Sequence, residues 1–174
     1  MSAHRQLEMP YLTIFVSFNY FIIILPMQKP LLLLALLFLL VSTSLFAQEK
    51  AIYQKNGIAI NGHDAVAYFT DSKAVEGSES HVYEWMGAKW LFSSSDHLEA
   101  FKANPEKYAP QFGGFCAYGV SENHKSPTDP NAWTIVDQKL YLNYSKKVKE
   151  LWSKDIPNRI QKANEYWPIL NKNN

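Results

Sequence analysis

A sharp change in composition after residue 47 constrains this chain more than any other feature. Residues 1–47 contain only three charged side chains (Arg5, Glu8 and Lys29), whereas the rest of the chain holds 15 Lys and Arg and 15 Asp and Glu. An apolar leader is therefore followed by one domain of ordinary size and composition. Two domains and a polytopic membrane protein are excluded. A disordered chain is excluded as well, because 18 aromatic residues follow residue 47.

Residues 27–47 have the pattern of a secretory signal peptide. Lys29 provides a positive start, residues 31–41 form an unbroken apolar run, and small and polar residues then lead to Ala47. The run is shorter than the roughly 20 apolar residues of a spanning helix. We therefore expect cleavage after Ala47 and a periplasmic or secreted protein, with an uncleaved leader that anchors the protein in a membrane as the alternative. Residues 1–26 are expected to be an overcalled N-terminal extension, the alternative being that the N-terminal part forms a pair of membrane helices.

The remaining part, residues 48–174, predicts a single domain with an α+β fold. Short apolar strands flank turn residues at three places, which predicts three hairpins over residues 51–60, 81–92 and 133–144. Serine caps and apolar spacing predict three helices over residues 93–104, 145–152 and 156–167. Residues 64–69 are a short strand or helical turn, and residues 109–130 are expected to be mostly loop. The order indicates a small antiparallel sheet built from hairpins, with about three helices packed on it.

The charge pattern argues against a nucleic-acid partner. Positive and negative side chains balance after residue 47, and no basic block is longer than Lys146-Lys147. Nucleic-acid binding needs a concentrated basic surface. A metal ion or a small ligand is the candidate partner, a protein partner is left open, and contact with a membrane is expected only through an uncleaved leader.

Cys116 is the only cysteine of the chain. A single cysteine excludes an intramolecular disulfide and every zinc site that needs several thiolates. It lies in a stretch rich in glycine and aromatic residues, 111–119, which leaves two interpretations open. Cys116 is either a small buried hydrophobe or a thiolate that binds a soft metal or acts as a nucleophile, and a thiolate needs a nearby cation, histidine or metal.

His97 is the histidine best placed to assist Cys116. It falls in the first turn of the helix predicted over residues 93–104, where the helix dipole disfavours a charged imidazole and so favours a metal ligand. The alternative is a histidine at the edge of the core that bonds to a carbonyl. Together Cys116 and His97 could hold copper(I) or zinc, although the chain has no metal-binding motif of regular spacing.

The other histidines of residues 48–174 are weaker candidates for a metal ligand than His97. His63 is adjacent to Asp64, but neighbouring residues of a strand point to opposite faces. His81 and His124 fall in segments that we expect to be solvated.

Four segments of the chain carry a family resemblance. They read NGHDAVAYF at residues 61–69, FSSSDHLEAFKANPEKY at 92–108, APQFGGFCAYG at 109–119 and DPNAW at 129–133. In this order they resemble the YHS-domain family of exported bacterial proteins. Shorter relatives resemble metal-binding modules with three cysteines, at the positions that are Ala67, Ser93 and His97 here, and with a proline at the position of Ala65. The resemblance therefore implies a metal-binding ancestry, and the loss of three thiolates should remove most of the affinity.

These features predict a small exported, non-catalytic binding domain with one weak copper or zinc site at His97 and Cys116. The alternatives are a thiol-dependent enzyme or redox protein that uses Cys116, and a structural or partner-binding module that uses exposed aromatic residues. The distance between the Cys116 sulfur and the His97 ring separates these hypotheses, because metal bonds of about 2.0–2.3 Å exclude shared ligation beyond about 5 Å.

Overall fold

The computed structural model divides the chain into two units at residues 47 and 48, and it describes residues 51–172 of the second. The predicted signal peptide (27–47) and the predicted N-terminal extension (1–26) lie outside the described residues. Among residues 51–172, no helix is long and apolar enough to cross a membrane.

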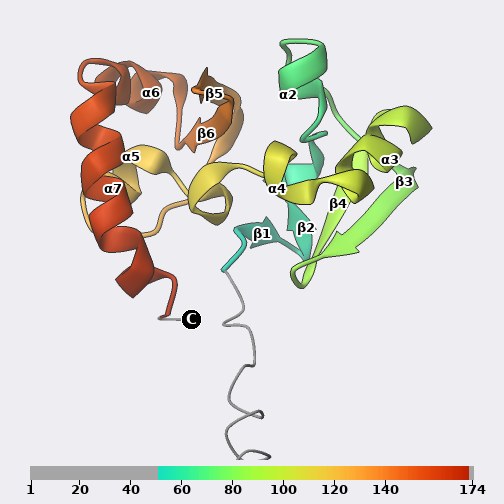
Figure 1. Ribbon diagram of the computed structural model, residues 1–174, viewed down its shortest axis with the longest axis horizontal. Coiled ribbons are helices and arrows are strands. Elements are labelled where there is room, and N and C mark those ends of the chain that lie inside the picture. Colours follow the sequence, from blue (N-terminus) through green and yellow to red (C-terminus); the bar gives the residue numbers. More distant parts are fainter. Residues whose placement is uncertain (1–50, 173–174) are drawn as a thin grey trace, which may run out of the picture. The chain divides into compact units, whose positions relative to one another are not determined.

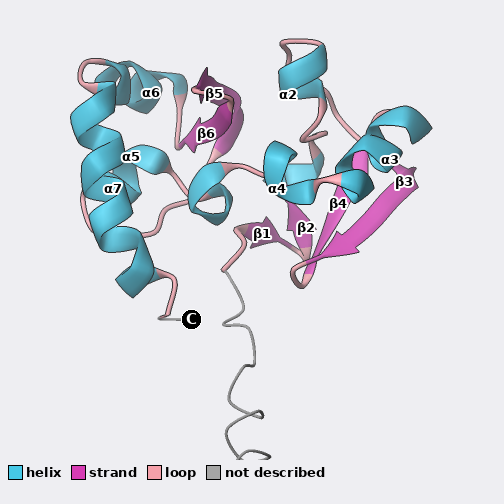
Figure 2. Cartoon of the chain, in the orientation of Figure 1, coloured by secondary structure: helices cyan, strands magenta, loops and turns pink. Residues whose placement is uncertain are grey.

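The first sheet has four strands in the order β1-β2-β4-β3 (Figures 1 and 2). Its members are β1 (Gln54–Lys55), β2 (Ile58–Ala59), β3 (Ser78–Trp85) and β4 (Ala88–Phe92). Two hairpins build it, as predicted, and their turns at Asn56-Gly57 and Met86-Gly87 have positive φ at both residues. Such turns match the twist of the strands that they join. The hairpins meet through a parallel contact between Ile58 and Lys89.

The third predicted hairpin forms a separate sheet. It pairs β5 (Asp129–Val136) with β6 (Lys139–Asn143) around a turn at Asp137 and Gln138. The α+β class is therefore confirmed, but the described residues form two small sheets where one was expected. One contact of the first sheet is parallel, and parallel contacts between distant segments leave no turn signal in the sequence.

Three helices occupy the predicted segments. They are α3 (Ser95–Ala103), α6 (Lys146–Ser153) and α7 (Ile156–Leu170). Each begins at a side-chain cap: Ser94 accepts a hydrogen bond from the His97 backbone N–H, Ser145 from Val148, and Asp155 from Asn158. Side-chain caps satisfy N–H groups that have no partner within the helix.

Several shorter helices go beyond the predicted three. One of them, α2 (Ala67–Thr70), is the helical turn that was one of the two forms expected for residues 64–69. The described residues also contain α4 (Pro105–Tyr108), α5 (Ala117–Ser121) and the 3₁₀ turns η1 (Ile60–Gly62) and η2 (Gln111–Gly114). Residues 109–130, expected to be mostly loop, hold η2, α5 and the start of β5. Helices of four or five residues complete about one turn, so they show no apolar periodicity by which a sequence could reveal them.

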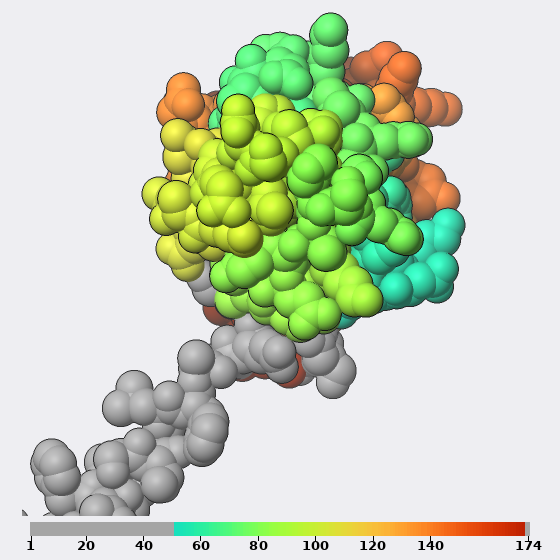
Figure 3. Space-filling model, turned by 90° about the vertical axis from the view of Figure 1, so that its right-hand side faces the viewer, coloured from blue at the N-terminus to red at the C-terminus, as the bar shows by residue number. Residues whose placement is uncertain are grey.

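Two apolar clusters lie on either side of β6. The first gathers Tyr68, Trp90 and Phe101 around the four-stranded sheet, and the second gathers Trp152 and Tyr141 under α5, α6 and α7. Successive residues of a strand point to opposite faces, and β6 accordingly sends Leu140 and Leu142 into the first cluster and Tyr141 into the second. The outer side of the first cluster, made largely by β3, β4 and α3, faces the viewer in Figure 3.

Candidate functional site

The centre of the candidate site is Asp64, whose side chain is fully buried just before α2. Its Oδ1 accepts the backbone N–H groups of Val66 (2.8 Å) and Ala67 (3.3 Å). Its Oδ2 accepts the backbone N–H (2.9 Å) and the hydroxyl (2.6 Å) of Ser93, and lies 2.6 Å from His97 Nδ1. A buried carboxylate is tolerated only when such donors replace its water.

These donors determine the charge of Asp64. Burial alone would raise the pKa of this carboxyl group. The hydroxyl and backbone N–H of Ser93, the His97 ring and the Val66 N–H outweigh burial and bring the pKa of Asp64 below its ordinary value. Asp64 is therefore a carboxylate at neutral pH and acts only as an acceptor.

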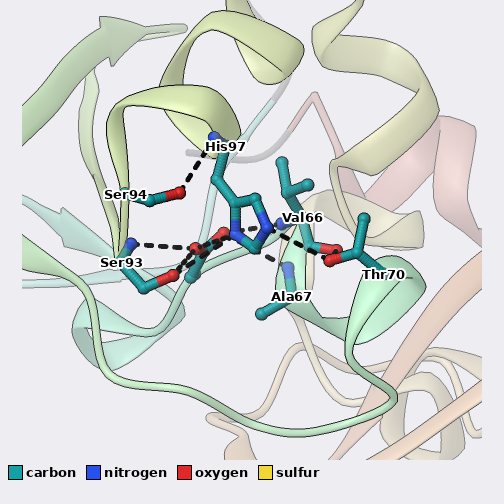
Figure 4. Close-up of polar contacts among 7 residues, drawn as sticks. Val66, Ala67, Thr70, Ser93, Ser94 and His97 are labelled. Carbon is teal, nitrogen blue, oxygen red and sulfur yellow. Dashed lines mark hydrogen bonds and ion pairs between the residues drawn. The ribbon is translucent and has the colours of Figure 1, made fainter.

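The ionised carboxylate orients the ring of His97. Because Asp64 only accepts, His97 Nδ1 carries a proton and donates it to Oδ2 over 2.6 Å (Figure 4). The Ser94 cap positions the backbone of His97 in the first turn of α3, as predicted. The side chain of His97 is 17 % exposed. The second ring nitrogen, Nε2, lies 3.2 Å from the hydroxyl of Thr70, an exposed residue.

The Thr70 hydroxyl has two neighbours and one proton. It lies 3.2 Å from the Val66 carbonyl, to which it can donate, and 3.2 Å from His97 Nε2. When it donates to Val66, its oxygen is free to accept a proton from Nε2. When it turns toward the ring, Nε2 accepts instead. The second nitrogen of His97 can therefore hold a proton or expose a lone pair without a large rearrangement.

Ala67, Ser93 and His97 occupy the three positions at which the resemblance places cysteines. All three contact the same carboxylate, Asp64, so the positions converge in space as a metal site requires. The groups that they present are a backbone N–H, a hydroxyl and a ring nitrogen. Only the ring nitrogen is a good ligand for a soft metal.

Sequence reasoning missed the role of Asp64. It compared this residue with its neighbour His63, whose Nδ1 instead lies 3.4 Å from the Asn61 carbonyl. One signal was available: Asp64 precedes the apolar run Ala65-Val66-Ala67, all of which is buried. A carboxylate buried with such a run needs donors from elsewhere in the chain.

Cys116 lies in a different neighbourhood and is 2 % exposed. Its sulfur accepts the backbone N–H groups of Tyr144 (3.2 Å) and Gly119 (3.4 Å), and its thiol lies 3.8 Å from the Asn143 amide oxygen. These partners belong to β6, the residue after it, and α5, whereas His97 belongs to α3, on the other side of the view in Figure 1. The hydrogen bonds of residues 51–172 do not bring His97 and Cys116 together.

His81 and His124 have other hydrogen-bond partners, the Ser80 hydroxyl and the Glu122 carbonyl. His124 is exposed, and His81 is half-buried on β3. Within the described part of the chain, no group of three or more His, Cys, Asp or Glu side chains could hold a metal ion.

Comparison with known proteins gives one match. Residues 66–112 match the family model of the YHS domain. The matched segment includes Ala67, Ser93 and His97, while Asp64 lies just before it and Cys116 just after it. No curated protein and no solved structure matches the chain significantly.

Proposed function

We propose, from the membership of this chain in the YHS-domain family, that it is an exported, non-catalytic binding protein that holds a soft metal ion weakly at His97. The observation that carries this proposal is the 2.6 Å hydrogen bond between the buried Asp64 carboxylate and His97 Nδ1. Metal-binding histidines almost always donate their second ring N–H to such an acceptor, which fixes the ring and its tautomer.

The contacts of Nε2 are compatible with a ligand role. With the proton on Nδ1, a neutral His97 has its lone pair on Nε2, the form that binds metals. The Thr70 hydroxyl next to Nε2 retains the Val66 carbonyl as a partner if a metal takes its place. Nε2 can therefore exchange its hydrogen bond for a metal bond while Asp64 keeps the ring in position.

The residues around His97 fit a single point of attachment and do not fit a closed metal site. Ala67 offers no donor side chain, and Ser93 uses its hydroxyl on Asp64. A copper(I) or zinc ion at His97 would complete its coordination with solvent or external ligands, which gives low affinity. The pairing of His97 with Cys116 stays a prediction, and a separate variant tests it.

Metal titration of the purified protein tests this proposal. Copper(I) and zinc are titrated in competition with a chelating dye, for the wild type and for His97→Asn. Asparagine can still donate to Asp64 but lacks the second ring nitrogen, so we expect at least a tenfold loss of affinity. His124→Asn, a change at an exposed histidine, is the matched control and should leave binding unchanged.

Two outcomes would overturn the metal site. One is a wild-type protein that binds neither ion, and the other is a His97→Asn variant with wild-type affinity. Cys116→Ala decides the second ligand: a loss as large as that of His97→Asn supports shared ligation, and unchanged affinity removes Cys116 from the site. Thr70→Val should retain or slightly increase the affinity, because it removes a competitor for Nε2.

Export is the second part of the proposal, and it rests on the leader. The positive start, the apolar run 31–41 and the small residues before Ala47 support a cleaved signal peptide. Mass spectrometry of the protein from its native cells should find Gln48 as the first residue, in the periplasmic or secreted fraction. A chain that keeps its leader and sediments with membranes would support anchoring and contradict cleavage.

Thiol chemistry at Cys116 is the second candidate function. Two backbone N–H groups point at its sulfur, and such donors stabilise a thiolate nucleophile. This function requires that iodoacetamide labels the native protein rapidly near neutral pH. If labelling occurs only after denaturation, Cys116 is a core residue and the candidate fails.

A further inference from the structure

The exposed hydroxyl of Thr70 lies at one end of a row of three side chains that continues through His97 to Asp64. Thr70 Oγ1 is 3.2 Å from His97 Nε2, and His97 Nδ1 is 2.6 Å from Asp64 Oδ2 (Figure 4). The imidazole ring is therefore held between a hydroxyl and a fully buried carboxylate. A hydroxyl, an imidazole and a carboxylate in this order form the arrangement by which enzymes of unrelated folds activate a nucleophilic oxygen.

The carboxylate gives the imidazole the tautomer that this activation requires. Because the ionised Asp64 accepts the proton of Nδ1, a neutral His97 ring has its lone pair on Nε2, the nitrogen next to Thr70. Nε2 can therefore accept the hydroxyl proton of Thr70. The imidazolium that forms is stabilised by the buried negative charge of Asp64. Thr70 and His97 are the groups that react, and Asp64 is a positioning residue.

The oxygen of Thr70 is accessible to a reagent from solvent. Thr70 is exposed and is the last residue of α2, whereas the side chain of His97 is 17 % exposed. The other neighbour of the hydroxyl is the Val66 carbonyl at 3.2 Å, which only accepts a hydrogen bond and does not cover the oxygen with a side chain. An electrophile can thus approach Thr70 from solvent while His97 accepts the proton from the protein side.

From this row of contacts we propose that Thr70 is a modification site, at which the hydroxyl takes an acyl group from an activated ester. Thr70 Oγ1 attacks the acyl carbon while its proton passes to His97 Nε2. The bond between the acyl carbon and the leaving oxygen then breaks, and the leaving group takes the proton from Nε2. The products are an acyl ester at Thr70 and a free alcohol, and the step needs no oxidant, reductant or cofactor.

The reaction ends at the ester and does not continue to turnover. The backbone N–H groups of Thr70 and Asp71 donate to carbonyl groups of the preceding turn, so neither stabilises the oxyanion through which an ester is hydrolysed. The alkoxide of Thr70 is also a poorer leaving group than that of an activated ester, so acylation proceeds where deacylation is slow. The proposal goes beyond the metal site and is compatible with a non-catalytic protein, but it requires an Nε2 that is free of metal.

The test uses 4-nitrophenyl acetate as the acyl donor, with EDTA present to keep Nε2 free of metal. Peptide mass spectrometry over time locates the acetyl groups, and hydroxylamine separates esters, which it removes, from acetylated lysines, which it leaves. Ser80 is the matched control within the chain, because its exposed hydroxyl lies 3.4 Å from His81 Nδ1 and no carboxylate pairs with that ring among residues 51–172. Since a positioned general base contributes about 10²–10⁴-fold, Thr70 should be acetylated about tenfold or more faster than Ser80.

Variants separate activation by His97 from simple exposure of the hydroxyl. His97→Asn can still donate to Asp64 but lacks Nε2, so it should slow acetylation of Thr70 about tenfold or more and leave Ser80 unchanged. Thr70→Ser keeps a hydroxyl at this position and should retain the ester. Circular dichroism confirms that each variant is folded, and the comparison of Thr70 with Ser80 needs the wild type alone.

Two results would overturn the proposal. One is acetylation of Thr70 no faster than that of Ser80 in the wild type, and the other is a wild-type rate at Thr70 in folded His97→Asn. Thr70→Val distinguishes this proposal from the metal site, because it removes the acceptor oxygen and should retain metal binding. A wild-type rate of 4-nitrophenolate release in Thr70→Val would also contradict acylation at Thr70.

Discussion

Replacing Asp64 by asparagine tests the central claim about the site, that one carboxylate holds it together. Asparagine has nearly the same shape, so the change alters charge and hydrogen bonding and leaves packing intact. Its amide group has one acceptor oxygen, whereas the two Asp64 oxygens accept from Val66, Ala67, Ser93 and His97. The amide nitrogen must therefore face groups that are donors now.

The better of the two orientations determines the magnitude. If the amide oxygen stays with Val66 and Ala67, the amide nitrogen replaces Oδ2, and the Ser93 backbone N–H loses its acceptor. A stranded N–H costs about 1–3 kcal/mol, and each lost bond to a charged acceptor costs about 1.5–3 kcal/mol. The Ser93 hydroxyl and the His97 ring can turn to accept and recover part of this. We therefore expect Asp64→Asn to lower the free energy of unfolding by about 3–5 kcal/mol, the range for a broken buried pair.

Urea denaturation followed by tryptophan fluorescence measures this change. Domains of this size have about 5–15 kcal/mol of stability, so a second variant guards against complete unfolding. Ser93→Ala removes one hydroxyl donor and should cost about 1–2 kcal/mol. Asp96→Asn changes an exposed acid in the first turn of α3 and should cost less than about 1 kcal/mol. If Asp64→Asn costs no more than Asp96→Asn, the carboxylate does not organise the site and the reasoning is refuted.

Three further predictions concern pH, close packing and capping. Folding lowers the pKa of Asp64, so the stabilisation from this carboxylate is complete above the ordinary aspartate pKa of about 4 and is lost as pH falls through the lowered value. Urea denaturation between pH 5 and pH 2 should show this loss of stability. The same dependence of the free energy of unfolding on pH in Asp64→Asn would contradict the prediction. Gly113→Ala should destabilise by about 2–4 kcal/mol, because it combines positive φ with a clash between the added Cβ and Ala51. Gly57→Ala is the control: this residue is also at positive φ, but no atom lies within 4 Å of the added Cβ, so the cost should be about 1 kcal/mol. Equal costs for the two variants would argue against the clash with Ala51. Ser94→Ala removes the cap of α3 and should cost about 1 kcal/mol in the same assay, and a change below a few tenths would show that the cap is dispensable.

The sequence predicts the hairpins and the longer helices because their signals are local. Asn56-Gly57 adopts positive φ at both positions, as a two-residue turn requires. Serine before an amphipathic segment predicts the starts of α3 and α6. No local sequence signal predicts the division into two sheets, since this division depends on which apolar cluster each face of β6 contacts. Leu140 and Tyr141 are neighbours in sequence, yet they contribute to different clusters.

The candidate site is predicted in part for the same reason. His97 in the first turn of a helix follows from spacing alone, and the family resemblance identifies Ala67 and Ser93 as equivalent positions. The role of Asp64 could not be found in this way, because its partners Ser93 and His97 are 29 and 33 residues away. The sign that the sequence does contain is the position of Asp64 directly before an apolar run. A carboxylate that is buried with such a run needs hydrogen-bond donors from distant segments.

Asp64 connects the three chain segments that a metal ion would connect in a site with three cysteine ligands. A structural metal connects chain segments by binding one ligand from each, and small metal domains unfold when it is removed. Here one carboxylate accepts hydrogen bonds from the start of α2, from the residue after β4 and from the first turn of α3. The same three segments are thus joined without a metal. It follows that folding does not require a metal in this chain, so the protein should stay folded when a chelator is added. If His97 binds copper or zinc, the chelator should lower the free energy of unfolding only by the small binding free energy of a weakly held ion.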